Sequence, residues 1–155
     1  MYYKIEEATR ATPYAASIKP FQKAKNGRGA WLAVLNQYAG KDKWEAEIKR
    51  HEKLLHTGEW KGQSNYTLER FIAEHRNAFV SMQAAAEHVT YQLPNEHSRV
   101  GYLLDAILCN DAGLQAAMAS IKTGQTVDGL RNDFEASATH LLPYDPVQKK
   151  RTDHA

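Results

Sequence analysis

The sequence is poor in cysteine and in long apolar runs. A single cysteine, Cys109, stands among 155 residues, so the chain cannot form an intrachain disulfide or supply the thiolates of a structural zinc site. No stretch approaches the roughly 18 consecutive apolar residues of a membrane span. The N-terminal MYYKIEEATR carries charges where a signal peptide requires an apolar run. We therefore expect a cytoplasmic chain that needs no cofactor and has no membrane partner.

The composition nevertheless favours a folded protein. Hydrophobic residues make up 43% of the sequence and aromatic residues 10%, while the formal net charge is only +2. A chain of about 150 residues buries roughly 68–70% of its unfolded surface, which is enough for a core without disulfides or metals. A disordered chain is thereby excluded, and either one domain or two small lobes is expected.

The near-neutral net charge conceals a regional difference. Residues 1–30 contain six basic and two acidic residues, a net of +4, whereas residues 63–140 contain five basic and nine acidic residues, a net of −4. Surfaces of opposite sign favour contact between copies of one chain. The alternative is that these charges belong to solvated helix faces and a basic tail, because the only basic cluster is Lys149-Lys150-Arg151.

Helical spacing dominates the sequence and predicts an all-α fold of seven or eight short amphipathic helices. Apolar residues recur at i, i+3, i+4 and i+7, with Gly, Pro, Asn and Asp at the boundaries. The longest such run, Leu68 to Met82, predicts a helix over 67–88. Residues 89–93 are expected to form a connector rather than a strand. Further helices are expected after Thr12-Pro13, from Trp31 to Gly40, from Asp42 to Gly58, after Asn95, from Asp111 to Gly124, and from Leu130 to Pro143 and Pro146.

Three segments follow from these boundaries. We expect an N-terminal helical lobe over 1–90, a C-terminal helical lobe over 91–145 and a basic tail over 146–155. A single bundle is the alternative, because roughly 60 residues is near the lower limit for an independent core.

Seven histidines prompt a search for catalytic or metal-binding patterns. His51 and His56 are five residues apart, whereas a zinc-binding HExxH helix needs four to place both imidazoles on one face. The pairs Glu74-His75, Glu87-His88 and Glu96-His97 are adjacent, and adjacent helical side chains point about 100° apart. The sequence thus predicts no catalytic residue, no metal site and no small-molecule substrate. An enzyme that uses His51, His56 or these pairs remains an alternative.

One resemblance to a known family covers about residues 20–151. The run from Asn26 to Gly40, with Gly27-Arg28, Trp31 and Tyr38, resembles the opening of gag polypeptides from copia-type LTR retrotransposons. Leu54-Leu55, a loop with Trp60, the long apolar run and Leu93-Pro94 follow in the order of that family. The segment from Asn132 to Pro146, with the basic cluster after it, is similar to the end of the region.

The resemblance implies a gag/capsid-like helical bundle that self-associates into a shell around the element's RNA. It implies no enzymatic activity, and one cysteine cannot supply the zinc knuckle of many gag proteins. Two sets of candidate residues follow from this interpretation. For self-association they are Arg28, Trp31, Tyr38, Val100 and Leu103. For non-specific contact with RNA they are Lys19, Lys23, Lys25, Arg28, Lys149, Lys150 and Arg151.

A second interpretation comes from a different class of protein. The same amphipathic helices suit a helical adaptor that binds a partner helix in an apolar groove, or a domesticated gag-derived interaction module. A homo-oligomer favours the capsid interpretation, and one stoichiometric foreign partner favours the adaptor.

Overall fold

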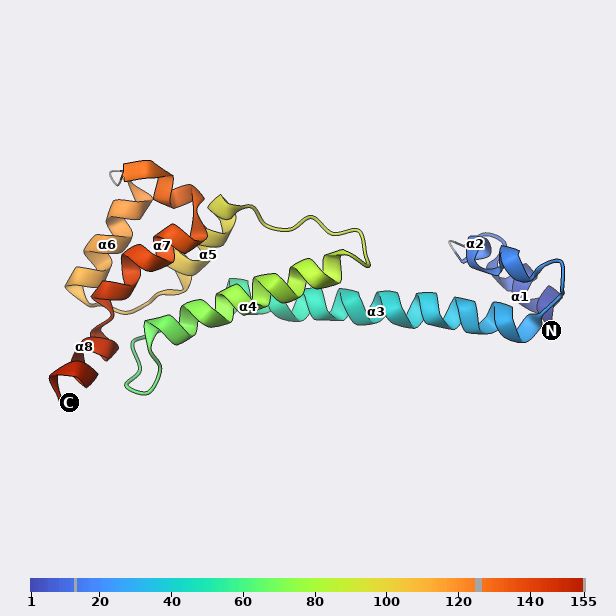
Figure 1. The fold of residues 1–155 in the computed structure, drawn as a ribbon, viewed down its shortest axis with the longest axis horizontal. Helices are drawn as coiled ribbons and strands as arrows, with labels where there is room; N and C mark the ends of the chain where they lie inside the picture. The colour runs from blue at the N-terminus through green and yellow to red at the C-terminus, as the bar shows by residue number, and fades with distance from the viewer. Residues whose placement is uncertain (13, 125–126, 155) are drawn as a thin grey trace. The chain divides into compact units, whose positions relative to one another are not determined.

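The computed structural model describes residues 1–12, 14–124 and 127–154 (Figure 1). Within these ranges the chain forms eight α-helices and three short 3-10 helices, and no strand. The predicted all-α fold is therefore confirmed. The predicted connector over 89–93 is also confirmed, because these residues belong to no helix or strand.

Tertiary contacts divide the chain into two compact units, Met1–Glu47 and Ile48–Ala155. The division falls inside one long helix, α3 (Gly27–Thr57), so each unit contains part of it. The lobe boundary that the sequence predicts near residue 90 lies within the second unit.

The first unit contains α1 (Tyr2–Thr9), α2 (Ala15–Ile18), a 3-10 helix (Lys19–Phe21) and the first part of α3. Its small core consists of buried side chains from each α-helix. A Cβ atom on Gly27 would lie 2.8 Å from the backbone nitrogen of Tyr2, so glycine allows α1 to pack closely against α3. The core residues are Tyr2, Ile5, Ile18 and Ala30.

Helix α1 is not among the helices that the sequence predicts, because its short run of tyrosines and charges lacks a clear apolar period. The predicted helix start at Thr12-Pro13 falls partly outside the described residues. The short helix expected after this pair is present as α2, which begins at Ala15. Thr12 does not cap it, because its hydroxyl donates a hydrogen bond to the Thr9 carbonyl at 2.8 Å.

The predicted break between two helices near residue 40 is wrong. Helix α3 runs through Gly40 and Asp42 for 31 residues. A glycine inside a helix costs only about 1 kcal/mol relative to alanine, and the surrounding residues are mostly good helix formers. Lys41 and Glu45 lie one turn apart with 3.7 Å between Nζ and Oε1, a pair that adds a few tenths of a kcal/mol.

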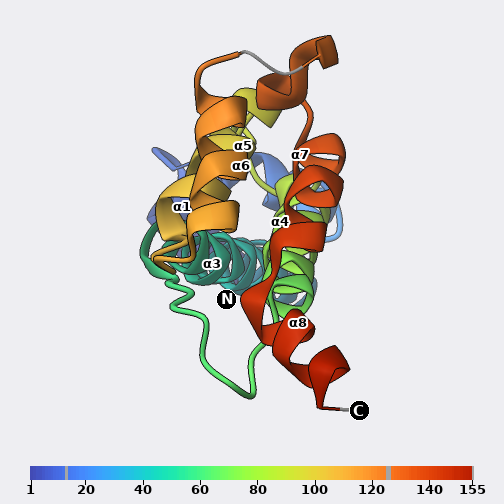
Figure 2. The same ribbon diagram turned by 90° about the vertical axis from the view of Figure 1, so that its left-hand side faces the viewer.

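In the second unit, α3 is followed by α4 (Leu68–Ala86), α5 (Glu96–Ala106), α6 (Ala112–Lys122), α7 (Phe134–Leu141) and α8 (Pro146–Asp153). Each of these five begins at a side-chain N-cap that accepts a backbone N–H. Figure 2 shows α5, α6 and α7 grouped together, with α8 continuing toward the C-terminus. The caps are Thr67, Asn95, Asp111, Asp133 and Asp145.

Most predicted helices of this unit are confirmed, including the one over 67–88 and those capped by Asn95 and Asp111. Gly124 has a φ of +65°, which fits its predicted place at the end of α6. Pro146 was expected to help end the last helix, and this prediction is wrong. It occupies the first position of a further helix, α8, where its missing N–H costs nothing, so residues 146–153 are helical.

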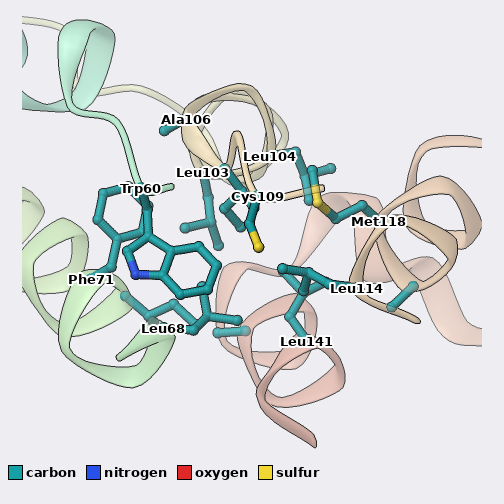
Figure 3. Packing of buried hydrophobic residues seen from close by; sticks show 14 of the residues in the cluster. Trp60, Leu68, Phe71, Leu103, Leu104, Ala106, Cys109, Leu114, Met118 and Leu141 are labelled. Carbon is teal, nitrogen blue, oxygen red and sulfur yellow. The ribbon is translucent and has the colours of Figure 1, made fainter. Parts of the chain in front are cut away.

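One hydrophobic core holds the second unit together (Figure 3). Trp60 is fully buried in it. Its backbone forms two hydrogen bonds with the residues on either side of Ile107. The Trp60 N–H donates to the Ala106 carbonyl and the Trp60 carbonyl accepts from the Leu108 N–H, both at 2.8 Å. The indole Nε1 donates to the Tyr66 carbonyl at 2.7 Å. Trp60 thereby fixes the loop between α3 and α4 to the end of α5.

Candidate functional site

The first candidate surface is an apolar face on the N-terminal part of α3. Trp31, Leu32, Leu35 and Tyr38 are 46%, 48%, 40% and 53% exposed. At 100° per residue these four side chains fall within an arc of about 120°. Ala30 is buried on the opposite side against the first-unit core. We call the exposed side the α3 face.

Arg28 belongs to the same face. It is exposed, and it precedes Leu32 and Leu35 by four and seven residues, so all three share one side of the helix. The structure thus brings together three of the residues expected to mediate self-association: Arg28, Trp31 and Tyr38. Their neighbours Leu32 and Leu35 complete a continuous apolar surface.

Val100 and Leu103, the other two residues expected at a self-association surface, lie elsewhere. Both are fully buried in the core of the second unit, so they stabilise α5 instead of presenting a surface. The spacing i, i+3 is the same for a residue that faces a core and for one that faces another chain. The expectation that Val100 and Leu103 lie on a self-association surface is therefore corrected, because both side chains belong to the core.

The basic residues of the first unit that are expected to contact RNA lie between the end of α2 and the first turn of α3. Lys19 and Lys23 are exposed there, and so is Lys25, whose Nζ lies 5.1 Å from the centroid of the Tyr3 ring. A hydrogen bond to Tyr3 raises the pKa of Lys25. Together with Arg28 they form an exposed group of four cations.

The three basic residues of α8 lie in two different surroundings. Lys149 places its Nζ 5.7 Å from the centroid of the Tyr144 ring. Lys150 and Arg151 instead line a pocket of about 750 Å³. His154 lines the same pocket, and the spacing Val147, Lys150, Arg151, His154 is i, i+3, i+4, i+7, one face of a helix. We call this cavity the basic pocket.

A glycine turn forms the second wall of the basic pocket. Gly62 has a φ of +75°, a conformation that L side chains rarely adopt. A Cβ atom at this position would lie 2.9 Å from Cys109 Sγ. The loop therefore runs directly against Cys109, and Lys61 and Ser64 beside the glycine line the pocket.

A buried carboxylate fixes α8 relative to α4. Asp145 is 2% exposed. Its Oδ2 accepts the Leu68 N–H at 2.9 Å, and its Oδ1 accepts the Val147 N–H at 2.9 Å. Val147 is itself buried in the core. One side chain thus caps the first turns of two helices, and the cations of α8 are carried by an anchored element.

The charge on the pocket walls is predominantly positive. Lys61, Lys150 and Arg151 face it, against a single carboxylate, Asp111. One oxygen of Asp111 accepts the Leu114 N–H at 3.0 Å and so caps α6. Lys61 pairs with Glu59 at 3.2 Å on an exposed surface. Neither Lys150 nor Arg151 forms an ion pair with any residue that the structure describes.

The side chains of the adjacent residues Glu74 and His75 contact different partners. Glu74 accepts the Tyr66 hydroxyl, whereas His75 packs against the Phe71 ring with 4.7 Å between centroids. Burial, with a smaller contribution from the charge of Arg99, lowers the pKa of His75 to about 4. Neither ring nitrogen of His75 has a hydrogen-bond partner among the described residues.

His56 and the pair Glu96-His97 show the same separation. The His56 ring lies 4.4 Å from that of Tyr102. Glu96 accepts the Phe134 N–H at 2.8 Å, and His97 Nδ1 lies 3.0 Å from Asn132 Oδ1. In the described part of the chain no group of three or more His, Cys, Asp or Glu residues is arranged to hold a metal ion. No helix within it is long and apolar enough to cross a membrane.

Sequence reasoning missed the basic pocket, because its walls come from residues 61–64, 109–111 and 146–154. The order Asp145-Pro146 was a usable indication, since an N-cap followed by proline begins a helix and would have placed the basic residues on helical faces.

Comparison with known proteins gives no match, either to a family model, to a curated protein or to a solved structure.

Proposed function

We propose that this chain is a self-associating capsid-type protein, similar to the gag polypeptides of copia-type retrotransposons, whose copies join through the α3 face. The observation that carries the proposal is the exposure of four large apolar side chains on one side of one helix. The order of sequence features from Asn26 to Arg151 supports the same assignment. The shell would assemble in the cytoplasm around RNA.

The composition of the α3 face suits an interface between proteins. Contiguous exposed apolar patches larger than roughly a few hundred Å² are uncommon on monomers and mark interaction sites. Trp, Tyr and Arg are the residues most enriched among those that dominate binding energy, and the α3 face carries Trp31, Tyr38 and Arg28.

A second copy of the same chain is the partner that the features of this sequence favour. A stripe at i, i+4 and i+7 is the pattern with which one helix packs along another. The net charge of +4 over residues 1–30 and of −4 over residues 63–140 adds attraction between copies. Repeated contacts between identical chains generate dimers, or larger closed assemblies where the rotation that relates the copies closes.

Contact with RNA would be electrostatic and non-specific in this proposal. Lys19, Lys23, Lys25 and Arg28 lie within ten residues of one another and are exposed. Cations that neutralise phosphates release counterions, so the affinity for RNA should fall steeply as the salt concentration rises.

The test measures assembly in a surface variant and a matched control. Leu35→Glu places a charge on the α3 face, whereas Val80→Glu does the same at a 55% exposed residue of α4. We expect wild type and Val80→Glu to form concentration-dependent oligomers in sedimentation velocity and particles in electron microscopy over a salt series. Leu35→Glu should stay monomeric at the same concentrations, because a buried unpaired charge opposes association.

Two results contradict the proposal. Wild-type protein that remains monomeric at millimolar concentration in every salt condition would exclude self-assembly. Equal assembly of Leu35→Glu and wild type would exclude the α3 face. Capture of one stoichiometric foreign partner without any homo-oligomer would instead support the helical adaptor.

A further inference from the structure

We infer that the basic pocket of the second unit is a binding site for an organic phosphate monoester of nucleotide size, either free or as the terminal phosphate of a nucleic acid. This inference concerns a different surface from the α3 face and does not depend on self-association. It rests on the position of the cations, the build of the walls and the size of the cavity.

The cations select the charge of the ligand. Lys150 and Arg151 lie on the pocket side of α8 and pair with no carboxylate among the described residues. Arginine recognises phosphate oxygens with two parallel N–H groups, and lysine adds a point charge. A phosphate monoester carries about −1.5 to −2 charges at pH 7, which two cations neutralise. Lys61 and His154 can add further donors at the rim.

The size and the remaining walls indicate that the phosphate carries an organic group. The volume of about 750 Å³ lies within the range of about 300–1,000 Å³ that is typical of small-molecule sites, and far exceeds the size of an inorganic ion. Pro146, Val147 and Cys109 supply an apolar surface. An apolar wall beside a cationic wall fits a nucleoside next to its phosphate.

The walls are held in place before any ligand binds. Asp145 anchors the start of α8, and Trp60 holds the loop that carries Lys61 and Gly62. The Gln115 side-chain amide donates to the Cys109 carbonyl at 2.6 Å and fixes the third wall. A site that is already formed loses little conformational freedom on binding.

Lys149 provides a matched control on the same helix. It has the charge of Lys150 and is adjacent to it, yet its Nζ is directed to the Tyr144 ring and it does not line the pocket. If the ligand binds in the pocket, substitution of Lys150 should lower the affinity and substitution of Lys149 should not. If the ligand is attracted only by the general charge of α8, both substitutions should lower the affinity equally.

The experiment measures binding of adenosine 5′-monophosphate to the full chain by calorimetry, with adenosine as the ligand without phosphate. We expect adenosine monophosphate to bind and adenosine not to bind. The double variant Lys150→Glu/Arg151→Glu should lose at least tenfold in affinity, while Lys149→Glu should remain within twofold of wild type. Circular dichroism verifies that each variant is folded, and a neutral Lys150→Gln/Arg151→Gln variant should also lose affinity.

The single thiol gives a second, local measurement. Cys109 is 9% exposed and lines the pocket, so bound ligand should slow its reaction with N-ethylmaleimide. We expect at least fivefold slower modification with saturating adenosine monophosphate and no change with adenosine. A 5′-phosphorylated oligonucleotide should also protect the thiol, and the same oligonucleotide with a 5′-hydroxyl should not.

Three results would overturn the inference. One is equal protection by adenosine and its monophosphate, and another is an equal loss of affinity in Lys149→Glu and in the double variant. The third is binding only of oligonucleotides, regardless of the terminal phosphate. Repeating the titration on Leu35→Glu separates the two proposals, because monomeric protein that still binds the monophosphate leaves this inference intact.

Discussion

Acidification should destabilise the second unit through His75. This residue is 1% exposed, and neither of its ring nitrogens has a hydrogen-bond partner among the described residues. Burial and the nearby charge of Arg99 disfavour the protonated imidazole and lower its pKa from 6.5 to about 4. The unfolded chain therefore binds a proton more readily than the folded chain does.

The size of the effect follows from the two pKa values. Above pH 6.5 both states are mainly neutral at this residue, so the folded state pays no proton-linked penalty. As the pH falls from 6.5 toward 4, the unfolded state alone is protonated and the free energy of unfolding decreases. With pKa values of 6.5 and about 4, the loss is about 2 kcal/mol at pH 5 and approaches about 3 kcal/mol below pH 4.

Urea denaturation at pH 7 and pH 5 measures this loss, with tryptophan fluorescence as the readout, to which the buried Trp60 contributes together with Trp31 and Trp44. His75→Leu is the comparison, because it removes the titrating group while it leaves the other six histidines in place. Wild type should lose about 2 kcal/mol more than His75→Leu between the two pH values. An identical pH dependence in the two proteins would refute the argument that a buried neutral imidazole causes the loss.

Three further substitutions have expected effects on stability that urea denaturation can measure. Asp145→Ala should cost about 1–3 kcal/mol, because it removes the acceptor from two buried backbone N–H groups, and an unchanged midpoint would contradict the double cap. Gly62→Ala should cost about 1–2 kcal/mol through its positive φ and its approach to Cys109, whereas a neutral effect would show that the turn relaxes. Gly40→Ala should stabilise α3 by up to about 1 kcal/mol, since apart from its chain neighbours and the local helix backbone no described atom lies within 4 Å of the added Cβ, and helix content from circular dichroism should not fall.

Local features of the sequence predicted the helices of the second unit well. Asn95 and Asp111 cap helices as expected, because an N-cap bond joins residues three positions apart and needs no tertiary context. The continuation of α3 through Gly40 was not predictable in the same way. A single glycine costs little, so whether it ends a helix depends on its neighbours and on packing.

Long-range features could not be read from the pattern. Val100 and Leu103 have the spacing of an amphipathic helix, and only the fold shows that a core covers them. The exposure of Trp31 and Tyr38 also follows only from the fold, because α1 and α2 pack against the other side of α3. The basic pocket requires three segments that are remote in sequence, so no local motif contains it.

The double cap at Asp145 also determines when the second unit can become complete during synthesis. Leu68, at the start of α4, donates its N–H to a carboxylate 77 residues further along the chain. A ribosome that adds about 5–20 residues per second needs several seconds more to deliver this acceptor after α4 has begun. Until then the first turn of α4 and the walls of the basic pocket remain unfinished. A nascent chain that stops before residue 145 should therefore lack the pocket, even though most of its helices have already been made.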